Sequence, residues 1–340
     1  MTLWAEINSQ AEVLAAAHEG LRKEVGSLGQ WIRDSGATHL VLAARGSSDN
    51  AGRYAQYLWG ARNGLSVALT TPSLFGAYSS PPHLAGALVV GISQSGESPD
   101  LLGVIEEANR QGRPTLAITN NAESPMAQLA TRSLELGVGI EEAVAATKTY
   151  TGQLLAIALV SAAIAGEAQE EQFRRLAPAV NEVLAAGEQI RKVAVDFASH
   201  DRCVVIGRGF HHATAHEWAL KIAELSYLVA QPFSSADFRH GPIALVEPGL
   251  AVLAVASQGP LFAEISELLE EVTSAGAKVV AISDRDDLSA EYLLRIPTTP
   301  EWLSPIPAIV AAQVFTYHLT VARGYDPDRP RGLRKVTRTV

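Results

Sequence analysis

Short apolar runs alternate along this chain with longer segments in which apolar residues recur every three or four positions. Segments 101–111 and 262–275 have this helical spacing. Runs rich in Val, Ile and Leu lie within blocks 38–48, 87–94, 112–120, 202–210, 251–258 and 276–284. Continuous apolar runs that alternate with helices are typical of a parallel sheet covered on both faces. The pattern therefore predicts α/β domains with doubly wound parallel sheets.

The first three of these blocks recur in the second half of the chain. Gly46 and Gly209 lie 163 residues apart, and the other two pairs of blocks are offset by 164 residues. We therefore predict a tandem duplication. The expected parts are an N-terminal helical segment that packs on the first domain (1–35), a first domain (36–165), a helical linker (166–198), a second domain (199–325) and a C-terminal tail (326–340).

Composition narrows the range of partners. The chain has 340 residues, 47% of them hydrophobic, and a formal net charge of -9, which argues against nucleic-acid and anionic-membrane partners. The single cysteine, Cys203, lies in an apolar run and is expected to be a buried hydrophobe. The N-terminus does not resemble a signal peptide, and the most apolar helix, expected at 154–165, is too short to span a bilayer. We expect a soluble, cytoplasmic protein.

A turn rich in hydroxyl groups follows the apolar run 87–90 and precedes a helical segment at 99–105. Backbone N–H groups at a helix N-terminus, together with the helix dipole, favour a bound phosphate. Neutral hydrogen-bonding side chains in this turn are Ser93, Gln94, Ser95 and Ser98. The alternative is a serine-rich connecting loop with a capped helix. Four such side chains in six positions favour phosphate binding.

A second glycine turn, at 46–48, also follows a predicted strand. Ligands of doubly wound sheets lie at the carboxyl ends of the strands, so one pocket can use both turns. A dinucleotide site is the obvious alternative. Neither first turn carries G-x-G-x-x-G, and the many hydroxyl groups favour a monophosphate.

Charged residues suggest catalysis in the second half. Glu217, Lys221 and Glu224 are spaced i, i+4 and i+7 on a helix expected at 214–229, so they share one face. His240 follows in a loop at 237–242. On spacing alone, a solvated stripe of ion pairs and a turn histidine without chemistry explain these residues as well.

Five motifs occur together: 141–149, the turn Ser-Gln-Ser-Gly-Glu-Ser at 93–98, the helix 217–227, Arg-His-Gly-Pro at 239–242 and the tail 330–337. Jointly they resemble the sugar isomerase (SIS) family, from about residue 20 to the end. Within it, the chain resembles the isomerase half of glucosamine-6-phosphate synthase and the SIS-type glucosamine-6-phosphate deaminases.

The resemblance implies roles for particular residues. The phosphate of the substrate would be held by Ser47, Ser48, Ser93, Gln94, Ser95 and Ser98, in a pocket lined by Val144 and Thr147. In the family a glutamate at the position of Glu224 shuttles a proton between C1 and C2, and Lys221 can stabilise oxyanion charge or steer that glutamate. Glu217 completes the catalytic helix.

Two further residues match family positions. His240 matches a histidine that opens the sugar ring and reaches the site from the neighbouring subunit, which implies a homodimer with a shared active site. Lys335 matches a tail lysine near the substrate carbonyl, where a neutral amine could form a Schiff base. A frayed, solvated tail is the alternative. The apolar helix 150–165 suits a dimer interface or equally a buried core helix.

The chain also departs from the synthase. It shows no N-terminal glutaminase domain, its one cysteine is internal, and Ala223 stands where the synthase has a lysine. We therefore expect an aminosugar-phosphate isomerase/deaminase that converts glucosamine 6-phosphate to fructose 6-phosphate and ammonia, or runs the reverse reaction with free ammonium.

Three alternatives remain: a fructosamine-phosphate deglycase, a non-catalytic sugar-phosphate sensor and a phosphosugar isomerase without nitrogen chemistry. We expect no cofactor and no metal, because no carboxylate cluster accompanies His211, His212 and His216. His211 and His212 are expected to line the crevice of the second half instead.

Overall fold

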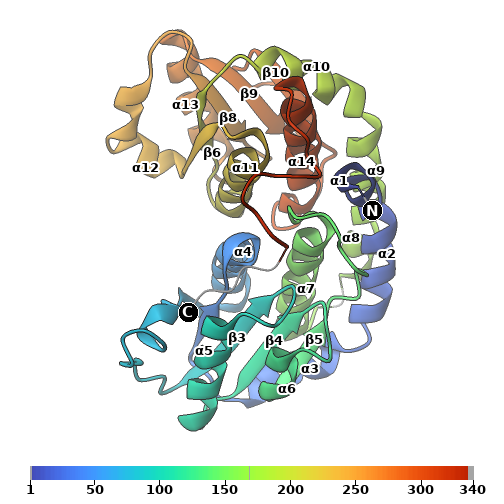
Figure 1. The fold of residues 1–340 in the computed structure, drawn as a ribbon, viewed down its shortest axis with the longest axis vertical. Coiled ribbons are helices and arrows are strands. Elements are labelled where there is room, and N and C mark those ends of the chain that lie inside the picture. The colour runs from blue at the N-terminus through green and yellow to red at the C-terminus, as the bar shows by residue number, and fades with distance from the viewer. Residues whose placement is uncertain (1, 168, 336–340) are drawn as a thin grey trace. The chain divides into compact units, whose positions relative to one another are not determined.

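The computed structural model describes residues 2–167 and 169–335, and the chain forms two compact units (Figure 1). The N-terminal unit comprises Glu12–Glu141, Lys148–Arg174 and Arg334–Val340, of which the last stretch is described up to Lys335. The C-terminal unit comprises Met1–Ala11, Glu142–Thr147 and Arg175–Leu333, of which the first stretch is described from Thr2. Each unit is built around one sheet.

The sheet of the N-terminal unit has five parallel strands in the order β2-β1-β3-β4-β5. They are β1 (His39–Ala43), β2 (Ser66–Leu69), β3 (Ala87–Ser93), β4 (Thr115–Thr119) and β5 (Arg132–Glu135). All residues of β3 and β4 are buried, as expected for strands covered on both faces. This explains why these strands are visible in the sequence as apolar runs.

Helices cover both faces of this sheet. Helices α5 (Pro99–Arg110) and α6 (Pro125–Leu129) pack against β3 and β4 on one face, where Leu101, Val104 and Ile105 join the core. Helices α4 (Gly46–Asn63), α7 (Lys148–Ala165) and α3 (Val25–Asp34) pack together on the other side. The remaining elements are α2 (Gln10–Leu21), η1 (Pro72–Leu74) and α8 (Glu170–Arg174).

The C-terminal unit has the same architecture, with parallel strands in the order β7-β6-β8-β9-β10. Its strands are β6 (Arg202–Ile206), β7 (Val229–Phe233), β8 (Ala251–Val255), β9 (Lys278–Ser283) and β10 (Tyr292–Arg295). Its helical elements are α1 (Leu3–Asn8), α9 (Leu176–Ala185), α10 (Gly187–Phe197), α11 (His211–Ser226), α12 (Ser235–Arg239), η2 (Pro242–Leu245), α13 (Phe262–Ser274) and α14 (Pro305–Ala322).

The two sheets share one topology. In each, the first strand in the chain lies between the second and the third, so the connections change direction beside it. This switch point lies between β1 and β3 in the N-terminal unit and between β6 and β8 in the C-terminal unit. The structure thus confirms the α/β class and the tandem duplication, and it places both predicted phosphate turns after the two strands of one switch point.

The N-terminal segment differs from expectation. We expected all of it to pack on the first domain, but α1 packs against α14 in the C-terminal unit. The Trp4 and Tyr317 rings lie 4.7 Å apart, and Gln10 Nε2 donates to Gln313 Oε1 at 2.7 Å. Periodicity shows which face of a helix is apolar, not which neighbour it meets. The segment expected as a linker is helical, and its helices α9 and α10 pack against α14.

Helices α7 and α14 are each 18 residues long and apolar enough to cross a membrane by length and composition. The expectation that the most apolar helix is too short was therefore wrong, since α7 begins at Lys148. Their most apolar windows are 83% and 78% buried within the structure, as in core helices. Burial of α7 also explains its composition without a dimer interface.

Candidate functional site

Glycine shapes both turns at the switch point of the N-terminal unit. Gly46 opens α4 with φ +54°, and Gly96 lies between β3 and α5 with φ +65°, a region that favours glycine. A Cβ atom at Gly96 would lie 2.3 Å from Ser124 Oγ. At Gly96 a side chain is therefore excluded by its neighbour, whereas at Gly46 glycine is favoured by the backbone angle alone.

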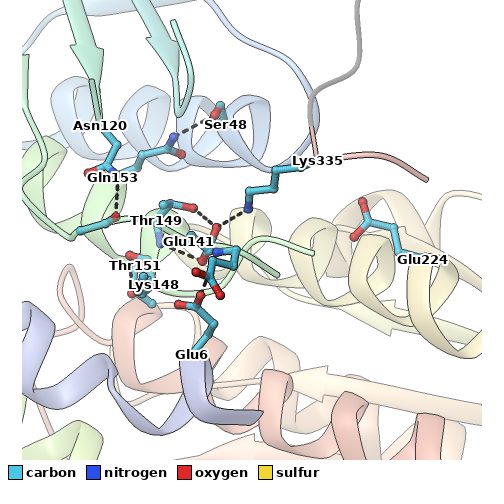
Figure 2. Close-up of polar contacts among 12 residues, drawn as sticks. Glu6, Ser48, Asn120, Glu141, Lys148, Thr149, Thr151, Gln153, Glu224 and Lys335 are labelled. Carbon is cyan, nitrogen blue, oxygen red and sulfur yellow. Dashed lines mark hydrogen bonds and ion pairs between the residues drawn. The ribbon is translucent and has the colours of Figure 1, made fainter. Parts of the chain in front are cut away.

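The predicted phosphate-binding serines lie on these turns. Ser47 and Ser48 are in the first turn of α4, and the buried Ser48 Oγ accepts a hydrogen bond from Gln153 Nε2 at 2.8 Å (Figure 2). Ser93 ends β3, and its Oγ accepts from the backbone N–H of Gly96 at 3.1 Å. Ser95 Oγ accepts from the N–H of Glu97 at 3.3 Å. The structure therefore gathers these hydroxyl groups at the carboxyl ends of β1 and β3.

Ser98 holds the N-cap position of α5, with extended backbone, but its side chain makes no capping hydrogen bond. A serine placed there only to cap the helix would accept from an N–H group of the first turn. A backbone contact holds the turn in place of such a cap: the backbone carbonyl of Gln94 accepts a hydrogen bond from the backbone N–H of Asn120 at 3.2 Å. The Ser98 hydroxyl is thus not used in capping, which favours phosphate binding over a connecting loop.

An arginine missed in the sequence links the two turns. Arg45 precedes Gly46, and its Nε donates to Asp100 Oδ2 at 2.7 Å. The Asp100 side chain is 4% exposed, whereas that of Arg45 is 48% exposed. Arg45 therefore brings positive charge to the turns and ties α4 to α5. The signal for it was its recurrence as Arg208 before Gly209.

The charged triplet lies on α11 in the C-terminal unit. The side chains of Glu217 and Lys221 are 0% and 3% exposed, and that of Glu224 is 23% exposed. Lys221 Nζ lies 3.6 Å from Glu217 Oε1 and also contacts the Glu224 carboxylate. The structure thus places all three on one face, as predicted. A solvated stripe of ion pairs is excluded, because the side chains of Glu217 and Lys221 are buried. Buried charges need a partner, and these two charges lie next to each other.

The remaining predicted residues of the C-terminal unit lie outside the charged triplet on α11. His240 is exposed at the C-cap of α12, before Gly241 with φ +143°, and no hydrogen bond or ion pair among the described residues joins it to the triplet. Val144 is half-buried and Thr147 is buried, both in the segment 142–147 of the C-terminal unit. Ala223 lies exposed on α11.

Lys335 belongs to the N-terminal unit, where its Nζ donates to Glu141 Oε2 at 3.0 Å (Figure 2). The tail is therefore held, not frayed, at this residue, while positions 336–340 lie outside the described residues. Glu141 is a potential site residue that sequence reasoning missed. Its position in the motif was visible, but its burial and its contact with the tail depend on the fold.

One cluster in the described ranges could hold a metal ion: His18, Glu19 and Glu170. Its carboxylates already pair with Arg22 at 2.8 Å and Arg174 at 3.2 Å, which weakens it as a cation site.

His211 is instead a buried residue in the C-terminal unit. Its Nε2 lies 2.8 Å from Ser257 Oγ and 2.9 Å from Ser304 Oγ. Burial lowers its pKa to about 3, so the ring is neutral. Cys203 is buried as expected, and burial raises the pKa of its thiol.

Comparison with known proteins gives a consistent picture. The SIS domain family model matches residues 35–163 and 196–323. The chain is 37% identical over 260 residues to glutamine–fructose-6-phosphate aminotransferase (isomerizing) of Thermococcus kodakarensis, a match that covers 73% of this chain and 43% of the relative. The chain spans about half the length of the curated relatives it matches.

Solved structures of similar proteins have the same fold. The C-terminal domain of glucosamine-fructose-6-phosphate aminotransferase from Francisella tularensis superposes with a TM-score of 0.87 at 25% identity, covering 96% of this chain and 98% of that one. Glucosamine-6-phosphate deaminase from Thermotoga maritima shares the fold, with a TM-score of 0.78, 23% identity, and coverage of 96% of this chain and 100% of that one.

Proposed function

The chain belongs to the SIS domain family, with two copies of the domain, and we propose that it is an aminosugar-phosphate isomerase/deaminase. The reaction is glucosamine 6-phosphate plus water to fructose 6-phosphate plus ammonia, or its reverse with free ammonium. The observation that carries this proposal is the chain of charges Glu217–Lys221–Glu224 on α11, in which Glu217 and Lys221 are buried and Glu224 is partly exposed. A purely structural helix face would hold apolar residues there.

The phosphate group is bound by the two turns of the N-terminal unit. Hydroxyl groups, the Gln94 amide and backbone N–H groups at the starts of α4 and α5 supply neutral donors. Arg45 adds one cation near them. The relatives act, by their names, on fructose 6-phosphate, which carries the same group.

Glu224 is the base that moves a proton between C1 and C2. It takes the proton from C2 of the open-chain aldose to form an enolamine and returns it to C1, which leaves an imine at C2. Water then hydrolyses the imine to the ketone and ammonia. Lys221, in contact with the Glu224 carboxylate, fixes its direction and stabilises negative charge that develops on oxygen. Glu217 balances the charge of Lys221 in the helix interior.

His240 and Lys335 complete the proposal. His240 of the partner subunit opens the sugar ring in a homodimer, and Lys335 acts on the substrate carbonyl. Mixing His240→Ala and Glu224→Gln proteins tests the shared site, because hybrid dimers regain one intact site. No recovery of activity after subunit exchange would exclude a shared site.

The deciding experiment is the release of ammonia and fructose 6-phosphate from glucosamine 6-phosphate by the purified protein without glutamine. We expect both products in equal amounts. Absence of both, with glucosamine 6-phosphate still raising the thermal midpoint, would overturn the deaminase. A fructosamine-phosphate substrate or a sensor role would then be examined with the same protein.

A further inference from the structure

The Glu141 carboxylate is buried at the start of α7. Its side chain is 0% exposed and lies in the loop between β5 and α7. Oε2 accepts from Thr149 Oγ1 at 2.5 Å, and Oε1 accepts from the Thr149 backbone N–H at 3.3 Å (Figure 2). The N–H groups of the first helical turn have no partner inside the helix, and the dipole there favours an anion. Both effects stabilise Glu141 as a carboxylate in this place.

The same carboxylate holds the tail. Lys335 Nζ lies 3.0 Å from Glu141 Oε2, and its side chain is 27% exposed. A buried carboxylate is costly without a counter-charge, and this ammonium supplies one. The two residues lie 194 positions apart in the chain. The contact therefore fixes a residue near the C-terminus against the start of a core helix.

We propose that Glu141 is the positioning residue for Lys335: its carboxylate, anchored by Thr149, sets where the lysine amine lies. This rests on the proposed function in so far as Lys335 acts on the substrate.

Glu141→Gln tests this role because it keeps the side-chain size and an acceptor for Thr149 but removes the charge. Glu141→Asp keeps the charge and shortens the side chain. Glu135→Gln is the matched control, since Glu135 is an exposed carboxylate in the same unit. Thermal unfolding shows first that each variant is folded, and Glu141→Asp serves where Glu141→Gln does not fold.

The first readout needs no catalysis. An amine-reactive reagent, followed by mass spectrometry of the peptide that contains Lys335, reports how accessible this amine is. We expect faster labelling of Lys335 in Glu141→Gln than in the wild type, and wild-type labelling in Glu135→Gln. Unchanged labelling in folded Glu141→Gln would overturn the proposal, even if the protein shows no activity on glucosamine 6-phosphate.

The second readout is a double-mutant cycle on turnover. Glu141→Gln should lower kcat by about 100-fold, as expected when a catalytic group moves by about an ångström, with little change in KM. Glu141→Gln combined with Lys335→Met should be no slower than Lys335→Met alone. Multiplied losses would show that Glu141 acts independently of Lys335.

Loss of activity in Glu224→Gln with unchanged Lys335 labelling would separate the base from the positioning contact.

Discussion

The switch points of the two repeats share an arginine, a glycine and an acidic partner. Arg45 pairs with Asp100 in the N-terminal unit, and Arg208 pairs with Glu264 in the C-terminal unit. The glycine after each arginine has a similar positive φ, +54° at Gly46 and +61° at Gly209. These features join the helix after the first strand to the helix after the third. They are structural parts of the fold that both copies keep.

The polar turns differ between the repeats. At the offsets that relate the repeats, Ser48 corresponds to His211, Gly96 to Pro260 and Ser98 to Phe262. Ser93 is retained as Ser257, but the Ser257 hydroxyl is engaged by the buried imidazole of His211. The turn at 257–262 in the second repeat thus lacks most of the hydroxyl groups of the turn at 93–98 in the first repeat, although both follow the third strand of their sheet.

The helices that follow the first strand of each repeat, α4 and α11, also differ, and here the second repeat carries the charged residues. Glu217, Lys221 and Glu224 on α11 correspond to Tyr54, Leu58 and Ala61 on α4. Tyr54 and Leu58 are fully buried, so α4 fills the same face with ordinary core residues. Under the proposed function, one repeat supplies the anion-binding turns and the other the acid–base helix. A shared frame does not imply shared chemistry.

The largest effect is expected at Glu224. Glu224→Gln removes the base but keeps the side-chain shape, so kcat should fall by about 100- to 10,000-fold while sugar-phosphate binding persists. Steady-state kinetics and isothermal titration with glucosamine 6-phosphate measure the two effects. Ala61→Gln, at the matching exposed position of α4, should leave both unchanged. Equal loss of binding and turnover in Glu224→Gln would instead indicate a structural role.

Gly96→Ala tests the first turn. The new Cβ would clash with Ser124 and require a positive φ, so the free energy of unfolding should fall by about 3 kcal/mol. Urea denaturation measures this change. Gly103→Ala within α5 is the control, since a Cβ there meets nothing within 4 Å. The control should be neutral or slightly more stable. Equal stability of both variants would contradict the steric argument.

His211 predicts a pH dependence specific to the second repeat. Burial lowers its pKa from 6.5 to about 3 in the folded protein, so the unfolded chain binds the proton first as pH falls. The contribution of His211 to the free energy of unfolding is present above pH 6.5 and is lost as pH falls toward 3. Between pH 7.5 and 5 the loss should be about 2 kcal/mol.

Urea denaturation at several pH values measures this loss. His211→Asn should show a smaller loss over the same range, whereas replacing the exposed His83 by Asn should keep the wild-type dependence. A variant at His211 with the wild-type pH dependence would show that another group is responsible.

The smallest effect is expected at Ser98. Because its hydroxyl makes no capping bond, Ser98→Ala should leave the thermal midpoint unchanged but raise KM for the sugar phosphate by about tenfold, as for one lost hydrogen bond. Ser234→Ala is the contrasting variant in the other repeat, because Ser234 does cap its helix, α12. It should lower stability by about 1 kcal/mol. Destabilisation by Ser98→Ala without a KM change would favour a merely structural turn.

The sequence by itself determined the α/β class, the duplication and the shared face of Glu217, Lys221 and Glu224. Strands β1, β3, β4, β6, β8 and β9 lie inside the sheets, and strands buried on both faces must be apolar throughout. Spacing along a helix likewise follows from its 3.6-residue turn. These features depend on local geometry, so they are visible without the fold.

The tertiary structure decided the rest. The edge strands β2, β5, β7 and β10 escaped prediction because they are partly exposed. Strands β2, β5 and β10 also have only four residues each, and β7 contains Pro232. Three further features were decided in the same way: the packing partner of α1, the burial of Glu217 and Lys221, and the contact of Glu141 with Lys335. Two of them are contacts between positions distant in the chain, and the burial depends on what covers a helix face. Periodicity shows which residues share a face, but only packing decides what that face meets.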